Sequence, residues 1–166
     1  MIFFPTLVLV GLSAWFLHKI GGGDFLPQFA KLVDRPQIVE GFTGYLSGRS
    51  ALTGEFRARK TEVFLKRKRT RHSVGYLVVS MVTNAPATVD SHEMSAYCRQ
   101  DRDAELALFA LEAKHEVQLT HDPFCLKARW APAGFFIFPG RFDAEKWGNV
   151  LASMHALAGS LERRAA

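Results

Sequence analysis

The hydrophobic and polar positions divide the chain into an apolar N-terminal run and a body of shorter patterns. Residues 2–17 read IFFPTLVLVGLSAWFL and carry no charge. A helix continued to Ile20 would be about 28 Å long, near the thickness of a bilayer core. We therefore expect residues 1–20 to form a transmembrane anchor, whose large apolar side chains are Phe3, Phe4, Leu7, Leu9, Leu12, Trp15 and Phe16.

Two other interpretations of this segment compete with the anchor. A buried helix in a soluble core is one, because the run is shorter than a typical membrane span. A cleaved signal peptide is the other, but no basic residue precedes Ile2, and Leu12 fits a cleavage pattern at Ala14 poorly. Lysine and arginine follow the segment and none precedes it, which predicts an outside N-terminus and a cytoplasmic body.

A joint of three glycines, residues 21–23, leads to a predicted short amphipathic helix over residues 25–33. This helix either lies in the headgroup region of the membrane or packs on the domain. Pro36 is expected to end it. Residues 21–40 are thus a linker with a short helix, and residues 41–54 read as a loop or an irregular strand.

Strand patterns follow in two groups. The first comprises residues 55–59, 62–66 and 74–82, and the last of these is apolar on both faces, which predicts a central strand covered on both sides. The second group comprises residues 117–120, 124–130 and 134–138. A turn at residues 121–124 separates the first two members of this group.

Two helices are predicted in the body. After a polar loop, Asp101 caps a helix over residues 102–114, whose apolar face is formed by Leu106, Phe109 and Ala113. Asp143 caps the last helix, which carries a single apolar stripe of Trp147, Val150, Leu151, Met154, Leu157, Ala158 and Leu161.

Together these elements predict an α+β fold, in which an N-terminal transmembrane helix precedes a small antiparallel sheet domain packed against two helices. The domain is expected to comprise residues 41–166. Its 48% hydrophobic content excludes a disordered chain.

Charge is concentrated in one segment. The chain has a net charge of +5, yet residues 57–71 alone hold eight basic residues and one acid. We expect the densest part to be a hairpin tip that contacts anionic lipid headgroups or an acidic partner subunit through Lys66, Arg67, Lys68, Arg69 and Arg71. A purely solvated tip is the alternative. Nucleic acid is not the expected partner, because only one aromatic residue lies among these charges.

No motif specifies a reaction, and no metal or cofactor is expected. The six histidines form no metal-ligand pattern and are interpreted as structural residues, with His155 on the surface. Cys98 could form the catalytic dyad of a thiol enzyme with His92 or His121, but no sequence motif singles out either pair. Cys125 is expected to be a partly covered neutral thiol.

The sequence favours a non-enzymatic, single-pass membrane protein that acts as an accessory or scaffold subunit of a larger membrane complex. Its partners would be the bilayer and the other subunits. The alternative is a membrane-tethered domain that binds a small apolar ligand such as a lipid or pigment, suggested by 14 phenylalanines. A thiol enzyme or hydrolase is a third class.

Overall fold

A six-stranded antiparallel sheet with helices packed against it forms the body of the protein. The computed structural model describes residues 11–12, 25–39, 51–66, 76–86, 88–130 and 142–165. The strands are β1 (Asp34–Val39), β2 (Ala51–Phe56), β3 (Arg59–Lys66), β4 (Tyr76–Val82), β5 (Val117–Asp122) and β6 (Cys125–Trp130). The helices are α2 (Phe25–Phe29), α3 (Ser91–Cys98), α4 (Arg102–Phe109) and α5 (Ala144–Ala165). A 3₁₀ turn, η1 (Ala30–Leu32), follows α2, and a π-helical turn, η3 (Ala110–Lys114), follows α4. The α+β class is confirmed, and of the four helices in the described residues the sequence predicted α2, α4 and α5 but not α3.

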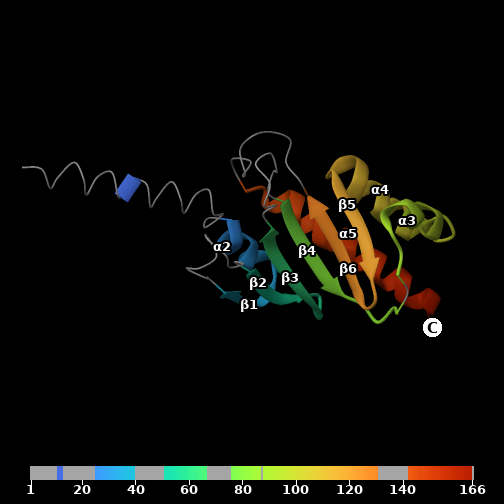
Figure 1. The fold of residues 1–166 in the computed structure, drawn as a ribbon, viewed down its shortest axis with the longest axis horizontal. Coiled ribbons are helices and arrows are strands. Elements are labelled where there is room, and N and C mark those ends of the chain that lie inside the picture. Colours follow the sequence, from blue (N-terminus) through green and yellow to red (C-terminus); the bar gives the residue numbers. More distant parts are fainter. Residues whose placement is uncertain are drawn as a thin grey trace, which may run out of the picture.

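The strands lie in the order β1-β2-β3-β4-β6-β5, and every neighbouring pair is antiparallel. After β4 the chain forms α3 and α4 before β5 returns at the edge of the sheet (Figure 1). The predicted central strand is confirmed, because β4 lies between β3 and β6, and its residues from Leu77 to Met81 are buried.

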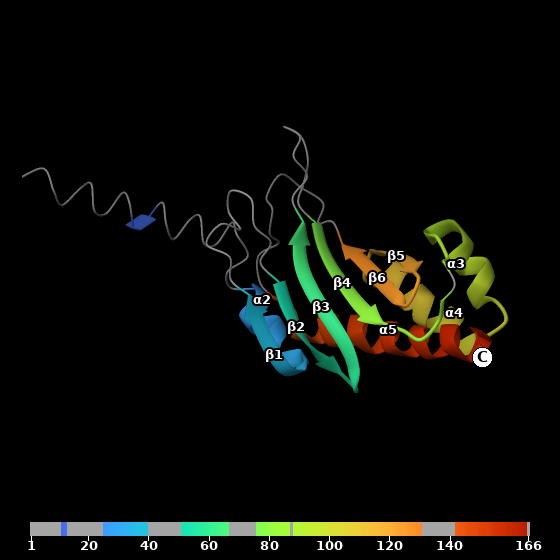
Figure 2. The same cartoon turned by 60° about the horizontal axis from the view of Figure 1, so that its bottom comes forward.

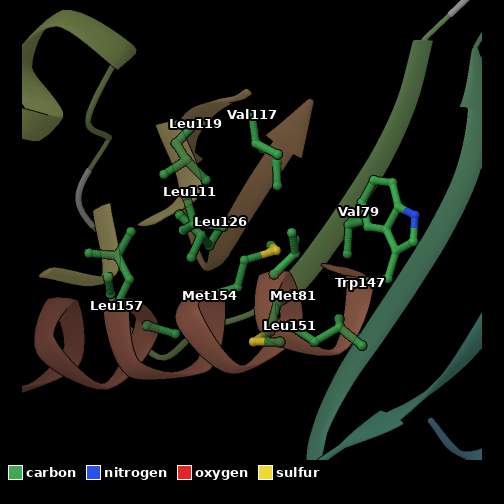
Figure 3. Packing of buried hydrophobic residues seen from close by; sticks show 14 of the residues in the cluster. Val79, Met81, Leu111, Val117, Leu119, Leu126, Trp147, Leu151, Met154 and Leu157 are labelled. Atoms are coloured by element: carbon green, nitrogen blue, oxygen red, sulfur yellow. The ribbon is translucent and has the colours of Figure 1, made fainter. Parts of the chain in front are cut away.

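Helix α5 supplies the largest share of the core. It crosses one face of the sheet (Figure 2), and every residue of its predicted apolar stripe is buried. Met154 and Leu151 point toward Val79 and Met81 of β4, and Leu157 lies toward Leu111 (Figure 3). The predicted cap is also present, since Asp143 Oδ1 accepts a hydrogen bond of 2.9 Å from the backbone N–H of Lys146.

Helix α2 packs on the domain, which decides between the two placements predicted for residues 25–33. Phe25, Leu26 and Phe29 are buried there. The expectation that Pro36 ends this helix is wrong, because the helical segment ends at Leu32 and Pro36 lies within β1. A proline fits this strand because β1 is the edge of the sheet, where a missing N–H leaves no partner unpaired.

The segment from 51 to 59 also differs from its prediction. Residues 51–54, expected as loop or irregular strand, begin β2, and the strand expected at 55–59 is interrupted by a hairpin turn at Arg57 and Ala58. Both turn residues have positive φ, 49° and 65°. Gly54 is required here, because a Cβ would lie 2.7 Å from Val33 Cγ2 and 3.0 Å from the carbonyl oxygen of Asp34, where β1 begins beside β2.

Helix α3 occupies the expected polar loop. Asp90 caps it by accepting hydrogen bonds of 2.9 Å from the N–H groups of His92 and Glu93. The strand alternation predicted over residues 117–130 is confirmed, but β5 continues to Asp122, so the turn is confined to Pro123 and Phe124. Phe124, predicted as the start of the second strand, is 53% exposed in this turn. The strand expected at 134–138 lies outside the described residues.

The apolar face predicted for residues 102–114 is wrong. Leu106 is 59% exposed and Phe109 is 68% exposed, and Ala113 is exposed as well. The side that packs on α5 carries Ala104, Ala107, Leu108 and Leu111 instead. The cap is as predicted, because Asp101 Oδ1 accepts from the N–H groups of Asp103 and Ala104.

Candidate functional site

Six strand termini meet at one end of the sheet. The register pairs Val39 with Ala51, Lys66 with Tyr76, and Trp130 with both Leu77 and Val117. The connections over residues 40–50, 67–75 and 131–141 therefore all start from this end. The opposite end holds the short turns at 57–58 and 123–124.

Aromatic side chains from four parts of the chain gather at the first of these ends. Phe25 lies 5.0 Å from Phe142 and 5.7 Å from Trp147, measured between ring centroids. Trp147 in turn lies 5.5 Å from both Phe29 and Trp130, with an edge-to-face geometry toward Trp130. Edge-to-face pairs add about 0.5–1.5 kcal/mol each beyond the area that they bury. We call this group of five rings, and the end of the sheet that holds it, the aromatic end.

Cations lie over aromatic rings at the same end. The Arg129 guanidinium is 3.9 Å from the centroid of Tyr76, and Lys146 Nζ is 4.6 Å from that of Trp130. These contacts hold two positive charges at the end of the sheet where β4 starts and β6 ends. The aromatic end therefore combines apolar rings with positive charge.

The predicted contact residues fall almost entirely outside the described part of the chain. Of the anchor residues, only Leu12 is described; it lies in a helical segment and is 58% exposed. Phe3, Phe4, Leu7, Leu9, Trp15 and Phe16 lie outside the described residues, as do Arg67, Lys68, Arg69 and Arg71. Lys66 is the last residue of β3, at the aromatic end. Among the described helices, none is both long and apolar enough to cross a membrane.

The other half of α5 is fixed to the sheet by polar contacts. Arg59 of β3 donates two hydrogen bonds to the carboxylate of Glu162, at 2.5 and 2.7 Å, and the backbone N–H of Asn84 donates to the same carboxylate at 2.8 Å. These donors lower the pKa of Glu162. His155 lies beside this group, against the ring of Phe56. It is half-buried, whereas the sequence analysis expected it on the surface. Burial, and then the nearby Arg59 and Arg57, lower the pKa of His155.

A second polar group joins α5 to the α3–α4 region. Asp101 Oδ2 accepts hydrogen bonds from Ser160 Oγ at 2.6 Å and from Arg163 Nη2 at 2.9 Å. Arg164 donates to the backbone carbonyl of Tyr97 and lies over its ring. The hydrogen bonds to Asp101 hold the pKa of its carboxyl well below the usual range. These groups connect helices to one another and are accounted for by the fold.

The two thiols have environments that suppress ionisation. Cys98 is 1% exposed, and burial raises its pKa to about 11, while His92 on the same helix is exposed. Cys125 is half-buried as predicted, and burial raises its pKa as well. A nucleophilic cysteine needs the opposite shift, toward a thiolate at neutral pH.

The buried histidines have structural roles. A ring nitrogen of His121 lies 2.8 Å from Thr83 Oγ1, and the His121 backbone exchanges two hydrogen bonds with Val89. His115 is buried, and burial lowers its pKa. Within the described ranges, no group of three histidine, cysteine or carboxylate side chains has the geometry to hold a metal ion.

Comparison of the chain with protein-family models, with curated proteins and with solved structures finds no match. The surfaces of the described residues therefore point to its function. Two of them stand out. One is the aromatic end, and the other is the outer side of α4, whose Leu106, Phe109 and Ala113 were wrongly predicted to be the buried face.

Proposed function

We propose that this protein is a membrane-anchored accessory subunit whose domain lies against the cytoplasmic leaflet, with the aromatic end facing the lipid. Residues 1–20 would span the bilayer. The observation that carries the proposal is that the entry of the N-terminal segment, at Phe25, and the first residue of the densest basic part, Lys66, lie at the same end of the sheet.

The short link between anchor and domain supports this orientation. Four residues separate Ile20 from Phe25. Even fully extended, this link spans at most about 18 Å. The aromatic end would therefore stay within about two Debye lengths of the headgroups at physiological salt, close enough for charge to matter.

The charges at this end have the sign that an anionic leaflet attracts. The basic run from Lys66 to Arg71 begins where β3 ends, and Arg129 and Lys146 add two further cations. Each lysine or arginine near an anionic surface contributes about 1 kcal/mol of attraction. Tyrosine and tryptophan rings such as Tyr76 and Trp130 are also the aromatic groups preferred at the headgroup level.

A pocket for a small apolar ligand remains the alternative function, and the described contacts offer it little support. This alternative was suggested by the 14 phenylalanines of the chain. Phe25, Phe29 and Phe142 pack on one another and on Trp147, so these rings fill the space between α2 and α5 themselves.

The full-length chain reconstituted in vesicles tests the proposal. A fluorophore is attached at position 146 in a Lys146→Cys variant that also carries Cys98→Ser and Cys125→Ser. The matched control carries the fluorophore on native Cys125, at the opposite end of the sheet, with only Cys98 replaced. The vesicles contain phosphatidylcholine and phosphatidylglycerol in equal parts, with a quencher on the headgroups.

We expect the fluorophore at position 146 to be quenched several-fold more strongly than the one at Cys125. Replacing Lys66, Arg67, Lys68, Arg69 and Arg71 by glutamine should reduce that difference. Equal quenching at both positions, or release of the protein by alkaline carbonate, would overturn the proposal.

A further inference from the structure

Helix α4 has apolar side chains on two opposite sides. Its inner side, with Leu108 and Leu111, packs on α5 and in the core. Leu106, Phe109 and Ala113 are exposed, and at about 100° per residue they lie half a turn away from the buried set. We call these three residues the α4 stripe. Helix α4 itself lies on the β5 side of the molecule, away from β1 and β2 (Figure 1).

The exposure of this stripe is unusual for a helix that already has a buried side. A surface helix normally presents polar residues opposite its buried face. Here two large apolar side chains, Leu106 and Phe109, are 59% and 68% exposed on the same side of the helix, three positions apart. Since the inner side of α4 already satisfies the core, the α4 stripe is available for a second contact.

The backbone changes directly after Phe109. Residues 110–114 form the π-helical turn η3, closed by a hydrogen bond of 3.2 Å from the His115 N–H to the Ala110 carbonyl. Such turns are rare and occur often at functional sites. This one begins directly after Phe109, contains Ala113 and leads into β5, which starts at the aromatic end.

Acidic side chains border the stripe. Residues 101–116 contain five acids and two bases, although the whole chain is basic. Glu105, Glu112 and Asp103 are exposed, and at about 100° per residue the two glutamates lie along one side of the stripe and Asp103 along the other. Exposed Arg102 lies on the same side of the helix as the stripe, one turn before Leu106. Their negative charge is felt by Cys98, whose pKa Glu105 and Glu112 help to raise. A surface that joins a phenylalanine to flanking carboxylates complements an apolar segment that carries lysine or arginine.

Two other occupants fit this surface less well. An anionic lipid surface would be repelled by the carboxylates. A second copy of the chain would present either the same acids or its basic run, and residues 66–71 (KRKRTR) contain no apolar side chain for Leu106 and Phe109 to bind.

We infer that the α4 stripe is the docking site for a basic amphipathic helix of a neighbouring membrane subunit, with leucine-type side chains against Leu106 and Phe109 and lysine or arginine beside Glu105 and Glu112. The inference rests on the proposed function and names the chemistry of its partner. Segments of this kind are common where transmembrane helices emerge on the cytoplasmic side, because lysine and arginine accumulate there. Since α4 leads to the aromatic end through η3, a partner segment leaving the same leaflet would be close to it.

Photochemical cross-linking of the full-length protein in its native membrane tests the inference. Phe109 is replaced by benzoylphenylalanine, and the cross-linked peptide is sequenced by mass spectrometry. The matched control carries the same group at Phe124, which is 53% exposed on the turn between β5 and β6. A second pair of proteins adds Glu105→Lys with Glu112→Lys, or Leu106→Ser, to the Phe109 cross-linker.

We expect a cross-linked segment in which lysine or arginine flanks apolar residues at helical spacing, at a yield at least tenfold above that from position 124. The charge-reversed protein should lose at least tenfold of that yield, and Leu106→Ser should also lower it. All three substituted side chains are exposed, so the melting temperature should stay unchanged.

Cross-linking to lipid, to a second copy of the chain, or to a segment without basic residues would overturn the inference, as would a yield no higher than that of the control. The proposed function is tested separately. If the protein resists carbonate extraction and its aromatic end is quenched by headgroup lipids, while position 109 captures no basic segment, only this inference fails.

Discussion

Arg59 and Glu162 lie 103 positions apart in the sequence and form a two-point ion pair between β3 and α5, with N–O distances of 2.5 and 2.7 Å. Their side chains are only 19% and 20% exposed, so the pair is well shielded from water. The Asn84 N–H shares the same carboxylate, which joins the end of β4 to this contact. The pair fixes the C-terminal half of α5 to the sheet, as the aromatic end fixes its N-terminal half.

Replacing Glu162 by glutamine should destabilise the domain by about 1–3 kcal/mol at pH 7, because Arg59 keeps its charge without a countercharge. Thermal unfolding of the full-length protein in detergent, followed by tryptophan fluorescence, measures the change. The matched control is Glu55→Gln, which removes an exposed pair with Arg35 at 3.7 Å and should change stability by less than about 0.5 kcal/mol.

The effect of Glu162→Gln on stability should also depend on pH, in a direction that the pKa of Glu162 determines. Since Arg59 and Asn84 lower the pKa of Glu162 in the folded state, its stabilisation is complete above the ordinary value of 4.5 and is lost as pH falls through the lower folded pKa. The difference in melting temperature between wild type and Glu162→Gln should therefore narrow below pH 4.5. A difference that stays constant down to pH 3 would contradict the assignment of the lowered pKa to Glu162.

The two leucines of α4 should respond very differently to truncation. Leu108→Ala removes a side chain that is 4% exposed and should cost about 2–4 kcal/mol, whereas Leu106→Ala, at 59% exposure, should stay within about 0.5 kcal/mol. Chemical denaturation measures the free energy of unfolding of both variants. The comparison is direct, because both are leucine-to-alanine changes on the same helix. Equal losses would mean that the helix is rotated from the orientation described here.

The contrast between α4 and α5 shows where sequence reasoning succeeds. Helix α5 has one apolar stripe, so the periodicity alone identified every buried residue of that stripe. Helix α4 has two, and the larger side chains, Leu106 and Phe109, suggested the core side. Small residues such as Ala107 occupy the inner side instead, which permits close packing against α5. Only the tertiary structure distinguishes two apolar faces of one helix.

Two elements were missed for different reasons: α3 had a sequence signal that was overlooked, and the turn at residues 57–58 had none. Asp90 and Glu93 have the spacing of a capping box, which would have indicated α3 within the supposed polar loop. The turn at Arg57 and Ala58 lacked its signal, because such hairpins usually contain asparagine and glycine. The aromatic end was not predictable at all, since its rings come from segments that are distant in sequence and meet only in the folded chain.

The missing turn signal leads to a stabilising substitution. Ala58 has a φ of 65°, which strains a residue with a Cβ, so Ala58→Gly should raise stability by about 0.5–1 kcal/mol. Ala51→Gly, the same exchange at the first residue of β2, serves as the control. It should lower stability by a similar amount, because Ala51 has no positive φ and gains nothing from the added backbone freedom. The melting temperatures of both variants test this prediction. A lower melting temperature for both would contradict the interpretation that Ala58 is strained.

Thiol titration separates a structural Cys98 from a catalytic one. With a pKa of about 11, on the order of 0.1% of Cys98 is ionised at pH 8, and its side chain is only 1% exposed. Ellman's reagent should therefore modify one thiol of the native protein, the half-buried Cys125, and both thiols after denaturation in urea. Cys125→Ser should abolish the native reaction and leave the reaction in urea. Because a nucleophilic cysteine must be both ionised and reachable, rapid native modification of Cys98 in that variant would restore the thiol-enzyme class, whereas its protection would leave Cys98 as a packing residue between α3 and the core.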